Sequence, residues 1–324
     1  MKQKVIFTAD DYGAFDFIDQ GIESAVAAGQ INSVAAFANT EGAADKILQL
    51  QGRFPDLEIG CHFTLTSGKP VLPPTVVPSL VEDGLFRSYQ EFSYRMTEQE
   101  VEAELQAQLE VFEKAKVPPR HLSSHHGALD FFEKYHKCLL KVSHQNFTGT
   151  IIPMRSALNE PGWKRLAYHE FLKWCLEDDL SDKEMSYLMN FQNTISSKRK
   201  IRNLYERLGY ETARYPDHLN NQHLGKPSQG IMKLAKINRK ARKKRGKLLE
   251  ELHSEREQKP IEFVFHLIKN DFQNLPKYMT ATGSYPGVNP QYFDGRLVEI
   301  RSLAKIRPND LEQQGVELCS WDEV

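Results

Sequence analysis

The sequence predicts an α/β protein in which helices pack around a parallel β-sheet. Over the first half of the chain, short apolar runs alternate with longer amphipathic segments, as expected for repeated strand and helix units. Polar side chains gather where several of the apolar runs end. A chain of 324 residues is also long enough to bury a large core. The pattern fits either a barrel or a doubly wound open sheet, and periodicity does not separate the two.

Elements of both kinds follow one another through the first half. Strands are predicted at 4–9, 31–39, 57–66, 121–127 and 150–154, and helices at 17–28, 41–52, 97–116 and 131–142. Thr97 and Glu100 form a capping box that opens the third helix, and Leu105 and Leu109 continue its apolar stripe. Residues 70–78 contain four prolines, which excludes a helix or a central strand there.

The second half of the chain has a different pattern. From 157 to 258 it is polar and mostly helical, and we interpret this part as a helical insertion within a single domain that spans 1–324. Strands are expected again at 261–267 and 316–320, with a helix between them near 295–305.

A basic run lies within the predicted insertion. Residues 233–247 hold nine Lys or Arg and no acid, and apolar residues recur there at near-heptad spacing. The pattern predicts a basic amphipathic helix. Its charged face is either a solvated surface or a contact for a polyanion such as a nucleic-acid backbone. No aromatic residues interleave the run, which argues against base stacking.

Composition excludes several classes of protein. The net charge of −1 gives the chain no overall attraction to nucleic acid or to anionic membranes. The four cysteines form no C-x-x-C pair and are too few for a disulfide framework, so reduced thiols are expected. The apolar run at the N-terminus is too short for a signal peptide, and no run is long enough to span a bilayer. We therefore expect a cytoplasmic protein with no membrane partner.

Two adjacent carboxylates follow the first predicted strand. Asp10 and Asp11 would point to opposite faces of a regular strand, so they converge on one site only if the chain turns there. Gly13 makes such a turn plausible. The alternative is that one aspartate caps the helix that begins near Phe17.

Histidines mark three further strands. His62 shares a strand face with Thr64 and Thr66, whereas Cys61 lies on the apolar face and is disfavoured as a nucleophile. The run His121 to Gly127 holds three histidines, of which His121 and His125 share one face with Ser123. Imidazole suits Zn²⁺ or another divalent metal, and an Asp/His/His set leaves an open position for water.

A further histidine closes the apolar run at 261–267. His266 is either a core imidazole with one hydrogen bond or a general acid/base that faces the same site.

In this order and spacing, the motifs resemble those of the YdjC-like carbohydrate deacetylases, which include the chitooligosaccharide deacetylases. The run from Asp10 to Gly13 is similar to A-D-D-[FY]-G, Gly60 to Thr66 to G-x-H-x-T-L, and His121 to His126 to H-L-D-S-H-H-H. Arg155 and His266 each end a strand, as in that family. The resemblance covers 4–156 and roughly 259–320.

The resemblance implies a fold, a site and a reaction. The fold would be an irregular (β/α) TIM-like barrel with the site at the carboxyl ends of its strands. The implied roles are metal ligation by Asp11, His62 and His125, general base catalysis by Asp10, general acid catalysis by His266, and substrate orientation or carboxylate fixation by Arg155. The implied activity is metal-dependent removal of acetyl groups from N-acetylated sugars such as diacetylchitobiose.

The chain departs from the family pattern at three positions. Ser123 replaces an Asp, Gly127 replaces a third His, and Leu267 follows His266 where the family has Pro. Loss of the Asp would weaken the orientation or basicity of a histidine ligand if that Asp lies behind it.

The metal and the partners stay open at this point. The Asp/His/His set suits Zn²⁺, whereas the family is usually described with Mg²⁺. The expected partner is a small acetylated sugar, with no membrane or nucleic-acid partner, and a homodimer is left open. The alternative function is a catalytically weak relative that binds a polyanion or nucleic acid through the basic helix 233–247. A two-metal phosphoesterase is disfavoured because no second carboxylate-rich cluster occurs.

Overall fold

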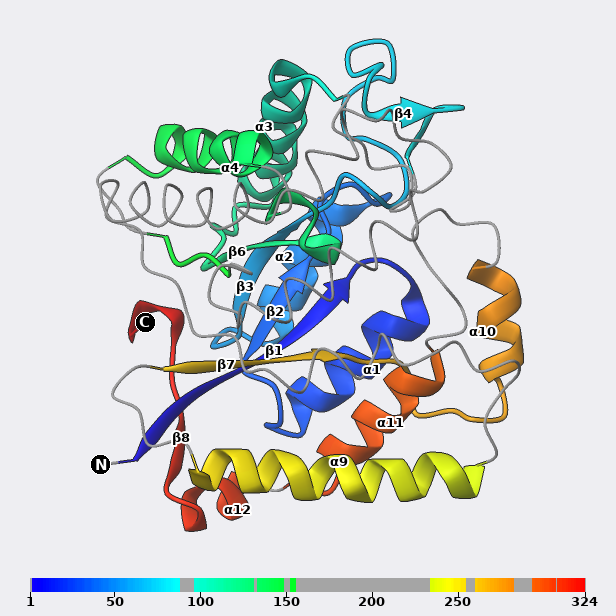
Figure 1. The fold of residues 1–324 in the computed structure, drawn as a ribbon, viewed down its shortest axis with the longest axis vertical. Helices are drawn as coiled ribbons and strands as arrows, with labels where there is room; N and C mark the ends of the chain where they lie inside the picture. Colours follow the sequence, from blue (N-terminus) through cyan, green and yellow to red (C-terminus); the bar gives the residue numbers. More distant parts are fainter. Residues whose placement is uncertain are drawn as a thin grey trace, which may run out of the picture.

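A parallel β-sheet surrounded by helices forms the centre of the molecule (Figure 1). The computed structural model describes residues 2–87, 96–130, 133–148, 152–155, 234–254, 260–282, 293–306 and 308–323. This arrangement confirms the predicted α/β class with a parallel sheet. No helix in the described ranges is both long and apolar enough to cross a membrane.

The strands of the main sheet pair in the order β6-β3-β2-β1-β7, and all the pairs are parallel. Their bounds are β1 (Gln3–Tyr12), β2 (Ser33–Ala36), β3 (Glu58–Phe63), β6 (Leu122–Ser124) and β7 (Ile261–His266). Beside the first residues of β1 lies β8 (Val316–Leu318). Beyond β6, Met154 forms a single parallel bridge with Leu122. Separately, β4 (Val81–Glu82) and β5 (Leu85–Phe86) form a small antiparallel pair.

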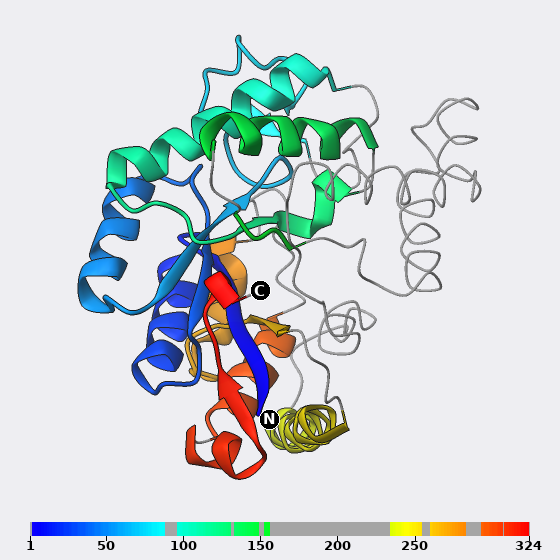
Figure 2. The ribbon, with the colours of Figure 1, turned by 90° about the vertical axis from the view of Figure 1, so that its left-hand side faces the viewer.

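Helices follow most of the strands and pack around the sheet. The helices of the first half are α1 (Asp16–Ala27), α2 (Ala43–Arg53), α3 (Glu98–Ala115) and α4 (Glu133–Asn146). Those of the second half are α9 (Leu234–Ser254), α10 (Leu275–Thr282), α11 (Phe293–Leu303) and α12 (Pro308–Gln313). Two 3-10 segments are η1 (His125–Asp130) and η4 (Trp321–Glu323). Figure 2 shows α1 and α2 on one side of the strands. As predicted, the Thr97 side chain caps α3 by accepting from the Glu100 N–H.

The register of the strands brings the predicted polar clusters to one edge of the sheet. Asp10 of β1 is the register partner of His266 in β7, and His62 of β3 is the partner of Ser123 in β6. Because parallel strands run in the same direction, their carboxyl ends lie at one end of the sheet, and these side chains meet there. The hydrophobic core beneath them includes Phe7, which packs edge-on against Phe263 and Phe265.

Several predicted strands are shorter in the structure, and the one that ends in the histidine run bears on the site. The strand expected at 121–127 stops at Ser124 because His126 and Gly127 adopt left-handed backbone angles, with φ of 58° and 62°. The chain turns into η1 at His125. Alternation along a continuous strand was therefore the wrong basis for placing His125 and His126.

The strands in the described residues form an open sheet, and not the closed barrel that the resemblance predicted. At one edge lies β7, and the segment 152–155 lies beyond β6 at the other. Closure of the barrel stays a prediction. Most of the predicted insertion lies outside the described residues, and its described part is α9, which packs against α11. The basic amphipathic helix predicted at 233–247 is confirmed from Leu234 onward.

Candidate metal centre and active site

A distorted turn at the end of β1 brings two adjacent carboxylates to the same site. The register of β1 against β2 shifts between Ala9 and Tyr12, and Asp11 adopts a φ of 72°. A positive φ is unfavourable for a non-glycine residue and often marks a functional site. Asp19 stabilises the turn by accepting a 2.6 Å hydrogen bond from the Gly13 N–H. The predicted turn is thus confirmed.

The alternative role of these carboxylates as a helix cap is wrong. Helix α1 begins at Asp16, its N-cap is Phe15, and no side chain makes a capping hydrogen bond there. Asp10 and Asp11 are instead almost completely buried at the end of β1.

Asp11, His62 and His125 form a buried cluster with the geometry of a metal site. One potential ligand atom from each lies within 4.8 Å of the others. Asp11 Oδ1 is 3.4 Å from His62 Nε2 and 3.1 Å from His125 Nδ1. Among the described residues, neither this oxygen nor His125 Nε2 has a hydrogen-bond partner of normal geometry. Buried polar atoms left without hydrogen bonds fit a site for a cation.

The pKa shifts of Asp11 and His125 also suit a cation. Burial raises the pKa of Asp11, but the Arg296 guanidinium and His125 outweigh it and hold the pKa well below its usual value. Burial lowers the pKa of His125, although Asp11 opposes this shift. An ionised carboxylate and neutral imidazoles are the forms that bind metals.

Ser123 occupies a supporting position behind His62. Its hydroxyl lies 2.7 Å from His62 Nδ1, so the other ring nitrogen faces Asp11. A partner on the second nitrogen orients a histidine ligand and tunes its basicity. The serine therefore makes the contact expected of the family's Asp, but with a neutral group.

Asp10 lies beside the cluster and is held by Arg155. Arg155 Nη1 donates a 2.6 Å hydrogen bond to Asp10 Oδ2, which is 3.7 Å from His62 Nε2. Burial raises the pKa of Asp10, but Arg155, His62 and His266 outweigh it, so the pKa lies below its ordinary value. The other oxygen, Oδ1, is buried without a hydrogen bond in the described part of the chain. An ionised carboxylate next to a metal position can accept a proton from bound water.

His266 ends β7 directly opposite Asp10 in the register. Its side chain is partly exposed, whereas the preceding residues of β7 are buried. Its backbone N–H donates to Glu299 Oε2 at 2.5 Å. The histidine therefore reaches the same edge of the sheet as the carboxylates, in a position where it can contact a bound molecule.

The other two histidines of the run, His121 and His126, are not part of the metal cluster. His121 is fully buried and stacks on Trp321 with ring centroids 4.5 Å apart. His126 Nδ1 lies 3.0 Å from the hydroxyl of Thr66. Cys61 is buried, which raises the pKa of its thiol well above the usual value. This supports the inference that Cys61 is not a nucleophile.

Residues 4–277 of the sequence match a family model described as YdjC-like protein. The chain belongs to the YdjC-like family. This confirms the resemblance inferred from the sequence motifs.

Curated relatives match part of the chain. A carbohydrate deacetylase from Halalkalibacterium halodurans is 36% identical over 128 residues, covering 38% of this chain and 53% of the relative. A chitooligosaccharide deacetylase from Proteus mirabilis is 35% identical over 133 residues, covering 39% of this chain and 50% of the relative. The chain thus spans about half the length of these curated relatives.

A solved structure shows the same fold over the full chain. It is an Enterococcus faecalis protein whose name suggests a role in cellobiose-phosphate cleavage, with a TM-score of 0.66 and 20% identity. The alignment covers 99% of this chain and 98% of that protein.

Three charged residues of this YdjC-like site were missed by sequence reasoning. Glu262 binds Arg155, Arg296 donates a hydrogen bond to Asp11 Oδ2, and Glu299 accepts from the His266 N–H. Glu262 had a signal, because an acid inside an otherwise apolar strand requires a partner. Arg296 and Glu299 lie on α11, where charged residues are ordinary, so the sequence offered no comparable signal for them.

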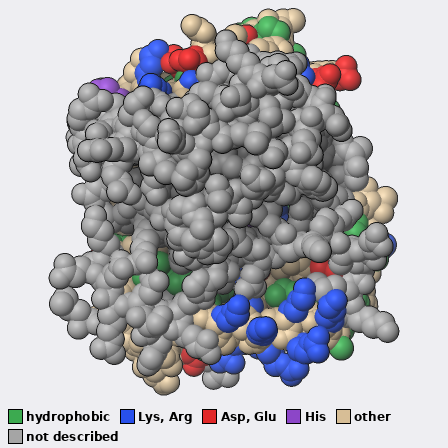
Figure 3. Space-filling view, in the orientation of Figure 1, with side chains coloured by type: hydrophobic (Ala, Val, Ile, Leu, Met, Phe, Trp, Pro, Cys, Tyr) green, Lys and Arg blue, Asp and Glu red, His purple; other side chains and the backbone are tan. Residues whose placement is uncertain are grey.

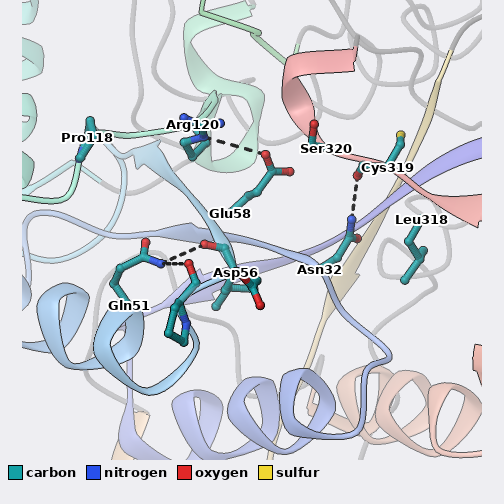
Figure 4. Close-up of a pocket in the computed structure, with 11 residues that line it drawn as sticks. Asn32, Gln51, Asp56, Glu58, Pro118, Arg120, Leu318, Cys319 and Ser320 are labelled. Atoms are coloured by element: carbon teal, nitrogen blue, oxygen red, sulfur yellow. Dashed lines mark hydrogen bonds and ion pairs between the residues drawn. The ribbon is translucent and has the colours of Figure 1, made fainter.

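A pocket near the amino ends of the strands is separate from this site (Figure 4). It is lined near the start of β3 by Glu58 and near the end of β8 by Cys319. Its polar groups bond within the protein: Asn32 donates to the Cys319 carbonyl, Gln51 donates to the Pro55 carbonyl, and Arg120 lies 3.9 Å from Glu58. These contacts give the pocket a structural role at the amino ends of the strands.

Proposed function

We propose that this protein is a metal-dependent deacetylase that removes acetyl groups from N-acetylated sugars, with N-acetylglucosamine oligosaccharides such as diacetylchitobiose as substrates. One observation carries the proposal: an ionised, buried Asp10 lies directly beside the Asp11/His62/His125 cluster. A base next to a metal position is what hydrolysis of an amide by water requires. The names of the curated relatives support the choice of an acetylated carbohydrate.

The metal ligands in this proposal are Asp11, His62 and His125. When bound there, a divalent cation supplies a Lewis acid that acidifies water and polarises the acetyl carbonyl. One carboxylate and two imidazoles are ligands suited to Zn²⁺, and the oxygen ligands that Mg²⁺ prefers would have to come largely from water. Both ions are therefore included in the test below.

Asp10 is the proposed general base. Its Oδ1 carries no hydrogen bond among the described residues, while its Oδ2 is occupied by Arg155. Oδ1 is therefore the oxygen that takes the proton of the attacking water. Arg155 keeps Asp10 ionised and fixes its orientation. Because Arg155 also binds Glu262 and is only 7% exposed, we propose that it fixes the carboxylate rather than touching the sugar.

His266 is the proposed general acid. Collapse of the tetrahedral intermediate breaks the C–N bond, and the departing amine needs a proton. His266 is the partly exposed group opposite Asp10, so it can donate that proton to the sugar nitrogen. Acetate and the free amino sugar are then released.

The alternative of a polyanion-binding protein without strong catalysis is not favoured. Such a protein does not require the complete Asp/His/His cluster, and the curated relatives carry enzyme names.

The test measures acetate released from di-N-acetylchitobiose by purified protein after chelation and after addition of Zn²⁺ or Mg²⁺. We expect release that the chelator abolishes, that one of the metals restores, and that Asp10→Asn lacks. The exposed substitution Asp56→Asn is the matched control. Metal-independent release, or full activity of Asp10→Asn, would contradict the mechanism. No release with either metal would contradict the proposed substrate class.

A further inference from the structure

The basic helix α9 has one buried cation on its inner face. Ile237, Ala241 and Leu248 are almost fully buried, and Lys244 lies among them with 3% exposure. These positions recur at helical spacing, so they form one stripe against α11. Apart from the half-buried Arg245, the other Lys and Arg side chains of α9 are exposed, and Lys and Arg side chains gather over this helix in Figure 3. A lysine is almost never fully buried without a partner of opposite charge.

The partner of Lys244 is Glu299 of α11. Lys244 Nζ binds Glu299 Oε1, and Glu299 is completely buried. The second oxygen, Oε2, accepts the backbone N–H of His266 at 2.5 Å. A single carboxylate therefore connects α9, which lies outside the sheet, to the last residue of β7.

We infer that Lys244 and Glu299 are a positioning pair that sets the orientation of His266 for proton donation. This inference rests on the proposed function, in which His266 is the general acid. The end of β7 is where the parallel hydrogen bonding with β1 stops, since Asp10 and His266 are the last register pair. Glu299 fixes the orientation of the last backbone N–H of the strand. The direction of the His266 imidazole depends on this backbone orientation, so it is fixed as well.

Lys244 is needed because Glu299 is buried. An unpaired carboxylate in the interior either takes up a proton or turns toward water. Both outcomes would weaken the charged hydrogen bond to the His266 N–H, since charge-assisted hydrogen bonds are the stronger ones. Loss of Lys244 is thus expected to displace His266 although the lysine itself does not touch the substrate.

Four variants test the inference: Lys244→Met, Lys244→Arg, Glu299→Gln and the double variant Lys244→Met/Glu299→Gln. Lys247→Met, an exposed position one turn further along α9, is the matched control. Glutamine keeps an acceptor oxygen for His266 but needs no lysine. The double variant therefore removes both charges without leaving one of them buried and alone.

Activity toward two substrates separates positioning from a purely structural role. Deacetylation of di-N-acetylchitobiose needs the general acid, because an amine must be protonated as it departs. An aryl acetate with an acidic phenol does not need it, because the phenolate departs without protonation. We expect Lys244→Met to lower kcat for the amide by up to about a hundredfold, with KM and aryl acetate hydrolysis little changed. Lys244→Arg and the double variant should recover much of the amide activity, and Lys247→Met should equal the wild type.

Nuclear magnetic resonance supplies a readout that does not depend on turnover. The His266 amide resonance should lie downfield in the wild type, because its proton is donated to a carboxylate. It should shift upfield in Lys244→Met and stay in place in Lys247→Met.

Defined results would overturn the inference. If Lys244→Met lowers amide and aryl acetate turnover equally, or only in proportion to the folded fraction, the pair is structural. If Lys244→Met does not fold, an unchanged His266 amide shift in Glu299→Gln overturns the inference as well, because that variant has lost the charged acceptor of this amide. A fully active His266→Ala would instead refute the acid assigned under the proposed function, while the amide shift would still report the contact.

Discussion

Arg155 binds Glu262 across the interior of the curved sheet. Arg155 Nε donates to the two carboxylate oxygens at 2.9 and 2.8 Å, although Arg155 follows the bridge beyond β6 and Glu262 belongs to β7 at the other edge. Both side chains are buried. This ion pair connects the two edges of the described sheet directly beneath the proposed base, so one arginine supports both the fold and Asp10.

Arg155→Met should therefore destabilise the protein strongly. It leaves two buried carboxylates, Asp10 and Glu262, without their cation, and breaking such a pair costs about 3–5 kcal/mol. The check is urea unfolding of the metal-free protein at neutral pH. Arg87→Met is the control, because its partner Glu82 is largely exposed, and it should cost no more than about 1 kcal/mol. Equal effects of the two substitutions would contradict the assignment.

The cost of Arg155→Met should also depend on pH. The pKa of Asp10 is lowered in the folded protein from its ordinary value of 3.8. A carboxyl group of this kind contributes stability above its unfolded pKa and loses it as the pH falls through the folded pKa. The wild type and the variant should thus differ fully above about pH 4 and converge below it. Unfolding free energies measured across the acid range test the sign, and a difference that grows on acidification would contradict it.

Ser123 variants should change metal affinity in opposite directions. Ser123→Ala removes the group 2.7 Å from His62 Nδ1, and loss of such a partner typically weakens metal binding by about 10- to 100-fold. Ser123→Asp places a carboxylate there, which should strengthen binding by making the imidazole more basic. Isothermal titration with Zn²⁺ measures the affinity of both variants, and Ser24→Ala, at an exposed position of α1, is the control. Tighter binding by Ser123→Ala would refute the supporting role.

Gly60→Ala should be destabilising because His121 occupies the space of a methyl group. A Cβ at position 60 would lie 2.3 Å from His121 Cε1, and overpacking a core typically costs about 1–3 kcal/mol. Gly52→Ala, in α2, meets nothing within 4 Å and should stabilise the protein by about 0.5–1 kcal/mol. Thermal and urea unfolding of the two variants should therefore shift in opposite directions. A neutral Gly60→Ala would show that His121 moves readily.

The three described cysteines should be unreactive in the folded protein. Cys61, Cys138 and Cys319 are buried, and burial raises the pKa of each thiol, to about 12 for the latter two. Little thiolate is then present at pH 8, and thiolate is the reactive form. In a Cys175→Ser background, a thiol reagent should label these cysteines only after denaturant is added. Rapid labelling of Cys61 in the native protein would restore it as a candidate nucleophile.

Sequence patterns predicted the parts of this protein that depend on local chemistry. The alternation of apolar and amphipathic runs predicted the parallel α/β architecture, and Thr97 predicted the start of α3. The motifs around Asp11 and His62 predicted a metal cluster, and the structure brings its three members together. Periodicity was wrong at His126, because a strand pattern carries no information on a left-handed turn.

By itself, the sequence determined which side chains stand at the ends of the strands, since each lies within a few residues of its own apolar run. Only the tertiary structure decided which charges those side chains meet. Arg155 lies 107 residues before its partner Glu262, and Arg296 lies 285 residues after its partner Asp11. Glu299 lies 33 residues after His266 and belongs to a different element. Burial makes such pairing obligatory, but the choice of partner depends on how the sheet curves and where α9 and α11 dock.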